Sequence, residues 1–177
     1  GFIQSNLGNW RVLEKGTHLN LCVFLDRQGR RLYGDGYDSD LGGAVLPAAF
    51  ASDPPAVWPT LRPALERQQA RGGLLPTEHG LLLLATRPIL TTQGMGPARG
   101  LLVFGRFLDP SLQRTLTEQT QVAFELLPVG DPRLTPTERA YLTTSRASAP
   151  EPRPGPTGTG FVYEVLLDLT GQPAALL

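Results

Sequence analysis

The residues best suited to chemistry are two arginines that follow apolar runs in the middle of the chain. Arg87 comes after the run 81–85, and Arg106 comes after the run 101–104. A guanidinium group can hold a carboxylate through two parallel hydrogen bonds, so an arginine at a strand end could bind an acidic ligand. The alternative is a structural role, in which each arginine reaches solvent or pairs with a surface carboxylate.

The proline after Arg87 restricts the backbone conformation of the arginine. Because Arg87 precedes Pro88, it is expected in an extended conformation, with its side chain on one face of a sheet. The hydroxyl groups of Tyr33 and Tyr163 could add hydrogen-bond donors to the same site. We therefore take these three side chains as candidate ligand contacts.

No other group of residues matches a known catalytic or metal-binding pattern. The sequence contains no nucleophile elbow, no His-Glu-x-x-His motif, no P-loop and no dinucleotide-binding fingerprint. His18 and His79 are the only histidines and stand far apart. The carboxylates of Asp35, Asp38 and Asp40 lack the downstream glutamate of a calcium loop. We expect no metal, no cofactor and no catalytic activity in this chain.

The composition excludes several classes of partner. The 177 residues include 16 basic and 16 acidic residues, for a net charge of zero, so no basic surface for nucleic acid or an anionic membrane is expected. No apolar stretch approaches the roughly 20 residues that span a membrane, and no signal peptide opens the chain. We expect one domain over residues 1–177, cut from a longer protein because both ends fall in apolar segments.

The spacing of apolar residues predicts an antiparallel sheet with short helices. A hairpin is expected at 20–34, with Gly29 supplying the positive φ of its turn. A helix from Trp58 should cover one face of the sheet and end at the glycines 72–73. A short strand at 74–75 and a strand pair within 81–104 should follow.

The second half of the chain is predicted to add further helices and strands to this sheet. In chain order these are a helix capped by Asp109, an alternating strand at 121–127, a helix with a capping box at Thr135 and Glu138, a flexible Pro/Gly-rich loop at 146–160, an alternating strand at 161–169 and a return strand at 174–177. The sum is an α+β fold, an antiparallel sheet of about five to seven strands flanked by short helices.

Five short motifs stand in a characteristic order along the chain. They are the Asp-x-x-Gly turn at 26–29, the Pro-Ile pair at 88–89, the Gly-rich connection 94–100, the Gly-Arg pair at 105–106 and the Asp-x-x-Gly-x-Pro turn at 168–173. In these features the sequence resembles the fourth class of CHASE domain. That family comprises extracytoplasmic sensory domains of bacterial membrane receptors.

The resemblance implies a PAS-like, Cache-related sensor fold between two membrane helices that lie outside this chain. It implies a periplasmic location in a bacterial inner-membrane protein and a homodimer in the full-length receptor. The output domain, also outside the chain, would be a histidine kinase, a diguanylate cyclase or phosphodiesterase, or a chemotaxis-type domain. Two features depart from the family: the long helix expected ahead of Phe2 is absent, and the segment 146–160 is atypical.

The resemblance also divides the candidate residues by role. Those that match family pattern positions are architectural: Pro88, Ile89, Gly100, Gly105 and Arg106. Arg87 lies outside that pattern, which favours it as a ligand-binding residue. The further candidates for ligand contact are Tyr33, Tyr163 and Trp58.

The sequence leaves two leading functions open, together with an unrelated cytoplasmic regulatory domain that has a PAS-like or GAF-like sheet. The leading hypothesis is a sensor that binds a small molecule between the sheet and the connection 34–73, and passes a shift of its termini to the membrane helices. The alternative is a protein-interaction or dimerisation module of the same fold, without a small ligand, which would expose an apolar patch. A pocket side filled by Trp58, Leu61 and Leu65 would remove the physical basis of small-molecule sensing there.

Overall fold

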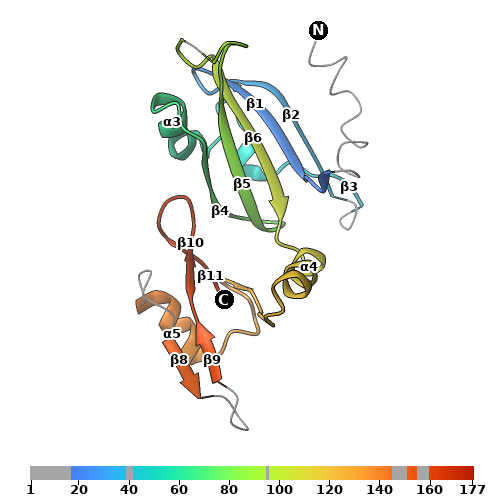
Figure 1. The fold of residues 1–177 in the computed structure, drawn as a ribbon, viewed down its shortest axis with the longest axis vertical. Coiled ribbons are helices and arrows are strands. Elements are labelled where there is room, and N and C mark those ends of the chain that lie inside the picture. The colour runs from blue at the N-terminus through green and yellow to red at the C-terminus, as the bar shows by residue number, and fades with distance from the viewer. Residues whose placement is uncertain (1–16, 39–41, 95, 145–150, 155–159) are drawn as a thin grey trace.

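A six-stranded antiparallel sheet forms the larger part of the molecule (Figure 1). The computed structural model describes residues 17–38, 42–94, 96–144, 151–154 and 160–177. The strand order is β3-β2-β1-β6-β5-β4. The strands are β1 (Leu21–Asp26), β2 (Arg31–Asp38), β3 (Gly43–Ala44), β4 (Arg71–Thr77), β5 (Gly80–Ile89) and β6 (Gly100–Phe107). With the short helices beside it, the sheet confirms the predicted α+β fold.

The first hairpin forms because its turn satisfies its own backbone. The Asp26 carboxylate accepts hydrogen bonds from the backbone N–H groups of Gln28 and Arg30, both at 2.8 Å. Gly29 has a φ of +84°, which glycine adopts without steric cost. At the same end of β1, Gly100 of β6 lies so close to the Leu25 carbonyl that an added Cβ would overlap it.

One face of the sheet is covered by η1 (Ala48–Phe50) and α3 (Trp58–Glu66). Alternate residues of the three central strands point to this face, since side chains in a strand alternate between its two sides. The buried core between sheet and helices includes Leu21, Val23, Leu25, Phe50, Val57, Leu61, Ala64, Leu82, Leu84, Leu101 and Val103. This layer places the N-terminal end of α3 beside the β1–β2 turn.

The predicted helix end at the glycine pair 72–73 is wrong. Helix α3 ends at Glu66, and both glycines belong to β4, which is longer than the strand expected at 74–75. A Cβ added at Gly73 would lie 2.6 Å from Cδ2 of Leu169, so this glycine admits a side chain from the C-terminal part of the chain. Glycines that are typical of a helix end are therefore present here because a side chain packs closely against the strand.

The C-terminal part forms a second, smaller sheet of three strands in the order β10-β11-β7 (Figure 1). Helix α4 (Pro110–Thr120) leads into it from the larger sheet, and Asp109 caps this helix by accepting a hydrogen bond from the Leu112 N–H at 2.6 Å. The remaining elements are β7 (Leu127–Pro128), α5 (Pro136–Thr144), β8 (Glu151–Pro154), β9 (Gly160–Tyr163), β10 (Val165–Leu167) and β11 (Pro173–Leu176).

The alternating segment 121–127 forms much less strand than predicted. Only its last residue, Leu127, belongs to β7, and Val122 is 59% exposed. Helix α4 ends where Gln121 adopts a φ of +56°, and residues 122–126 then run without a paired strand. Alternation makes an extended segment compatible with a sheet, but pairing also needs a free strand beside it.

The segment 161–169 forms two strands instead of one. β9 pairs with β8, whereas β10 pairs with β11, and Glu164 between them belongs to neither strand. The predicted return strand at 174–177 is confirmed by β11. Within the loop expected at 146–160, residues 151–154 form β8 and Gly160 begins β9. Residues 146–150 and 155–159 lie outside the described part of the chain, as do residues 1–16.

The capping box at the start of α5 is present as predicted. The Thr135 N–H donates to Oε2 of Glu138 at 2.7 Å, and the Glu138 N–H donates to the Thr135 hydroxyl oxygen at 3.3 Å. These reciprocal bonds satisfy two donors that a helix start leaves without partners. Among the described residues, no helix combines the length and apolar character needed to cross a membrane.

Candidate functional site

Arg87 and Tyr33 lie on the sheet face opposite α3. The pairing registers place Tyr33, Phe24, Leu102 and Arg87 in one row across β2, β1, β6 and β5. The Phe24 and Tyr33 rings meet edge to face, with centroids 6.1 Å apart. The two candidates thus share a face, but two apolar side chains separate them.

Tyr163 and Trp58 lie elsewhere. The Tyr163 hydroxyl donates to Oε1 of Glu138 at 3.2 Å, within the C-terminal part of the fold. Trp58 is the first residue of α3, on the covered side of the larger sheet. The four candidates therefore occupy three places, and Tyr163 does not share a site with Arg87.

The five residues matched to architectural positions all lie in β5 and β6. Pro88 is buried, and Gly105 packs so closely that an added Cβ would lie 3.0 Å from Cβ of Leu21. Arg106 is half-buried on the same face as Arg87. In the described part of the chain, no carboxylate lies within ion-pair distance of either arginine.

The space expected to hold a ligand, directly between the sheet and the connection 34–73, is filled by side chains. Phe50 and Leu61 are fully buried there, and Trp58 and Leu65 pack against the same core. Close packing of this kind leaves no room for a small molecule without displacing core side chains. A ligand site on this side must therefore lie at the margin of the core.

A cleft of about 490 Å³ lies at that margin, beside α3. Three segments line it: residues 27–28 of the β1–β2 turn, one side of α3 together with the residue after its C-cap, and residues 97–98 of the connection before β6. The lining residues from the α3 segment are Trp58, Arg62, Leu65, Glu66 and Gln68. We call it the α3 cleft. Of the residues expected to contact a ligand, it contains Trp58 alone.

The β1–β2 turn holds the Trp58 indole in the cleft wall. An added Cβ at Gly29 would overlap the indole ring, so the ring packs directly on the turn backbone. The backbone N–H of Trp58 donates to the Pro55 carbonyl at 2.9 Å, at the start of α3. The turn glycine thus has two functions, because it provides the positive φ of the hairpin and the surface on which the indole lies.

The charges of the cleft come from two arginines and one glutamate. Nε of Arg62 lies 2.7 Å from Oε1 of Glu66 one helical turn later, and both side chains are more than half exposed. No carboxylate of the described residues lies within ion-pair distance of Arg27. The cleft therefore presents one guanidinium group without a counter-charge.

Part of this site lies within a turn that the sequence predicts. Arg27 and Gln28 are the two variable positions of the first Asp-x-x-Gly turn. Asp26 and Gly29 stabilise the turn, and the two exposed residues between them line the cleft. Which element faces them, however, depends on where α3 packs.

Groups with shifted pKa values elsewhere have structural roles. Burial, reinforced by the nearby Asp35, raises the pKa of the Cys22 thiol to about 12, so this cysteine is a poor nucleophile. Backbone hydrogen bonds from its own N–H and from Ala48 lower the pKa of Glu78, which thereby holds η1 to the β4–β5 turn. No group of three or more metal-ligating side chains occurs among the described residues.

The comparisons with known proteins identify the class of this domain. Residues 1–127 match the family model of the CHASE4 domain, so the chain belongs to the CHASE4 family. This is a family of sensory domains, and the chain is a sensory domain without catalytic activity of its own. The residues after this match include α5 and the strands β10 and β11 of the smaller sheet.

One curated relative and one solved structure are similar to the chain. The methanogenesis regulatory histidine kinase FilI of Methanothrix harundinacea (strain 6Ac) is 24% identical over 184 residues, which cover 99% of this chain and 19% of the relative. The chain thus spans about a fifth of that protein. The second is the crystal structure of the extracellular domain of the histidine kinase vpHK1S-Z8. It shares 12% sequence identity with this chain and has a TM-score of 0.46, and the match covers 96% of this chain and 73% of the other.

Proposed function

We propose that this chain is the extracytoplasmic ligand-sensing domain of a transmembrane signalling protein. The observation that carries the proposal is membership of the CHASE4 family over residues 1–127. The similarity to a histidine kinase over nearly the whole chain favours a kinase output, with a diguanylate cyclase or phosphodiesterase as the other output. The chain would act as one PAS-like sensory domain, on the periplasmic side of a bacterial inner membrane.

The contact between the two sheets supplies a route for a signal. The Leu169 N–H donates to the Leu74 carbonyl at 2.9 Å, which attaches the β10–β11 turn to the edge strand β4. The Leu169 side chain is 8% exposed and belongs to the core of the larger sheet, beside Gly73. The smaller sheet is therefore anchored in the larger one by a buried side chain.

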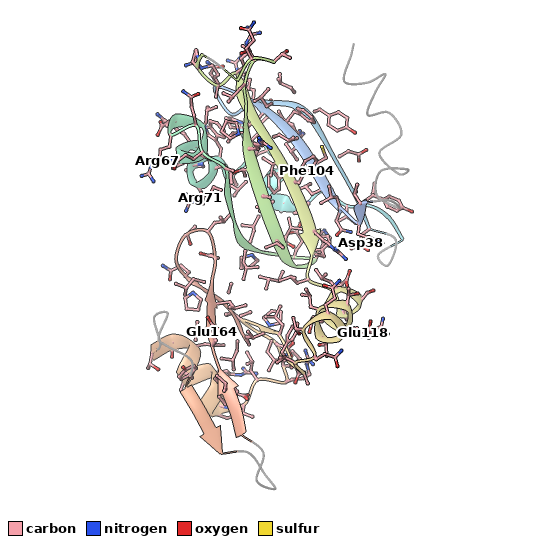
Figure 2. The ribbon with its side chains drawn as sticks, in the orientation of Figure 1. Asp38, Arg67, Arg71, Phe104, Glu118 and Glu164 are labelled. Atoms are coloured by element: carbon pink, nitrogen blue, oxygen red, sulfur yellow. The ribbon has the colours of Figure 1, made fainter. Side chains whose placement is uncertain are left out.

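Arg71 joins this anchor to α3. Its Nη2 donates to the Leu169 carbonyl at 2.9 Å, and its Nη1 donates to the Thr60 carbonyl of α3 at 3.2 Å. Arg71 and Arg67 both lie beside α3 (Figure 2). A movement of α3 would therefore displace the β10–β11 turn through one side chain.

The smaller sheet can carry such a displacement to the C-terminal residue. Leu177 and Glu164 exchange two backbone hydrogen bonds of 2.9 Å, and Leu176 is 1% exposed in the core of this sheet. Paired and buried backbone moves as a unit with its sheet. In this proposal, ligand binding beside α3 shifts the C-terminal backbone and biases the output domain.

The test uses the full-length receptor that contains this domain. Arg71→Ala should change basal output activity, measured as autophosphorylation in a kinase, because it disconnects α3 from the β10–β11 turn. Arg67→Ala is the matched control, since Arg67 is the C-cap of α3 and, among the described residues, makes no hydrogen bond to the smaller sheet. Output that is unchanged in both Arg71→Ala and Leu169→Ala receptors, with normal expression, would contradict this route.

A protein-interaction role is favoured by the sheet face opposite α3. Leu83 is 44% exposed there, and Phe24, Leu102 and Phe104 of the same face are only half-buried (Figure 2 labels Phe104). Under this second proposal the face packs on a second copy of the chain. Sedimentation of the wild-type and Leu83→Glu chains tests it: a dimer should become a monomer, whereas identical sedimentation would exclude this face.

A further inference from the structure

We propose that the α3 cleft binds a singly charged aromatic carboxylate, with its ring against Trp58 and its carboxylate on Arg27. The inference rests on the proposed sensory function, because it names the ligand class of that sensor. It uses only residues that line one cavity, contributed by the β1–β2 turn, by α3 and by the connection before β6.

The apolar part of the cleft favours a flat ring. Trp58 is half-buried and its indole is held against the backbone of Gly29. Leu65 is half-buried beside it, and Ala98 is 4% exposed. Aromatic rings pack on an indole in offset or edge-to-face geometry and gain more than their buried area alone supplies.

The charges of the cleft favour one negative charge on the ligand. Because Arg62 is paired with Glu66, Arg27 is the guanidinium group that remains for an anion. Its planar fork fits a carboxylate through two hydrogen bonds. A second negative charge on the ligand would meet no further free cation in the cleft and would face the Glu66 carboxylate.

The connection before β6 favours a carboxylate over a phosphate. A phosphate cradle is built from consecutive backbone N–H groups, commonly at a helix N-terminus. Pro97 has no backbone N–H, and the connection continues into β6 instead of a helix. The anion must therefore be held mainly by side chains, and the side-chain amides of Gln28 and Gln68, which also line the cleft, can act as further donors.

The volume of the cleft sets the size of the probe. Small-molecule sites typically enclose about 300–1,000 Å³, and the α3 cleft falls within this range at about 490 Å³. A single benzene ring would leave much of it filled with water. A two-ring acid is the better probe, and naphthoate is the simplest compound that combines two fused rings with one carboxylate.

The experiment is a titration of the 177-residue chain, followed by NMR of its backbone amides. The probes are naphthoate, naphthylmethanol, which lacks the charge, and cyclohexanecarboxylate, which lacks the aromatic ring. Naphthoate should shift the amides of residues 27–29 and of Ala98, and each comparison compound should bind at least about tenfold more weakly.

Two variants assign the contacts. Arg27→Gln should weaken naphthoate binding about tenfold or more and leave naphthylmethanol binding unchanged. Trp58→Phe keeps an aromatic ring in the wall and should weaken naphthoate binding a few-fold. Arg67→Gln is the matched control, because Arg67 lies between Glu66 and Gln68 at the C-terminal end of α3 but does not line the cleft. The affinity of this variant should equal that of the wild type.

Several results would overturn the inference. These are equal binding of naphthoate and naphthylmethanol, equal binding of naphthoate and cyclohexanecarboxylate, wild-type affinity in Arg27→Gln, or no shift at residues 27–29 with any probe. If one of these occurs while Arg71→Ala still alters the output of the full-length receptor, the ligand class is wrong and the sensory function stands. Specific naphthoate binding without any effect of Arg71→Ala would instead separate the cleft from the proposed signal route.

Discussion

The Arg71 guanidinium group donates a 2.9 Å hydrogen bond to the carbonyl oxygen of Leu169, which lies 98 positions later in the chain. The same side chain donates to the Thr60 carbonyl in α3. One arginine at the start of β4 thus connects the helix beside the cleft with the turn of the smaller sheet. In Figure 1 that turn, between β10 and β11, lies beside β4, and Asp168 of the turn forms a bridge with Leu74 of that strand.

Arg71→Ala should destabilise the fold by about 1 kcal/mol, because two carbonyl groups lose a charged hydrogen-bond donor in a partly exposed setting. The measurement is equilibrium urea unfolding. Arg67→Ala, the control on the same side of α3, should change the free energy of unfolding by less than about 0.5 kcal/mol. Equal effects in the two variants would mean that the Arg71 contacts do not stabilise the fold.

Leu169→Ala should destabilise the fold by about 2–5 kcal/mol, because it empties a site in the core of the larger sheet. The side chain is 8% exposed and packs beside Gly73. Leu32→Ala is the matched control, since Leu32 is 62% exposed and its loss should cost less than about 0.5 kcal/mol. Calorimetric melting of both variants would show whether Leu169 belongs to the core as described.

Gly29→Ala should destabilise more than Gly171→Ala. The two glycines close similar Asp-x-x-Gly turns, with φ values of +84° and +82°, so both alanine variants incur the same backbone strain of about 1 kcal/mol. Only at Gly29 would the new Cβ also overlap the Trp58 indole, whereas nothing lies within 4 Å at Gly171. Similar losses of stability in both variants would show that the indole does not pack on the turn.

Asp168 should make stability fall in acid. Burial would raise its pKa, but the Thr170 hydroxyl and the backbone N–H groups of the turn donate to its carboxylate and hold the pKa below its ordinary value. A depressed folded-state pKa stabilises the fold above the unfolded pKa of about 3.9, and the contribution is lost as pH falls through the folded value.

Asp168→Asn tests this expectation by melting curves between neutral pH and about pH 3. The variant should be less stable than the wild type by about 1 kcal/mol at neutral pH, and the difference should shrink in acid as the wild-type carboxylate is protonated. Glu118→Gln, on the exposed side of α4, controls for the loss of one surface charge. A difference that stays constant with pH would show that the Asp168 charge does not stabilise the turn.

The features that could be predicted from the sequence depend on hydrogen bonds between near neighbours. The Asp26 carboxylate is bonded to N–H groups two and four residues later, and the Asp109 cap and the box of Thr135 with Glu138 reach only three residues. The groups that form such contacts lie within a few residues of one another, so residue type and spacing suffice to predict them. The apolar runs at 20–26, 81–85 and 101–104 likewise identified β1, β5 and β6.

Tertiary structure decided the features that depend on a distant neighbour. Residues 121–127 alternate like a strand, but most of them have no strand to pair with. Local spacing predicts a helix end at Gly73. The side chain that leaves no room for a Cβ there belongs to Leu169, which lies 96 residues later in the printed sequence. Tyr163 is paired with Glu138 instead of sharing a site with Arg87.

The candidate site shows the same division. The sequence alone determined that residues 26–29 form a turn and that Trp58 begins a helix, since these follow from local spacing. That the indole lies on Gly29, that Arg62 is matched by Glu66 while Arg27 is not, and that a cleft remains between them were decided only by packing. The physical reason is that a cavity is the space left where elements from distant parts of the chain meet, and no single segment encodes it.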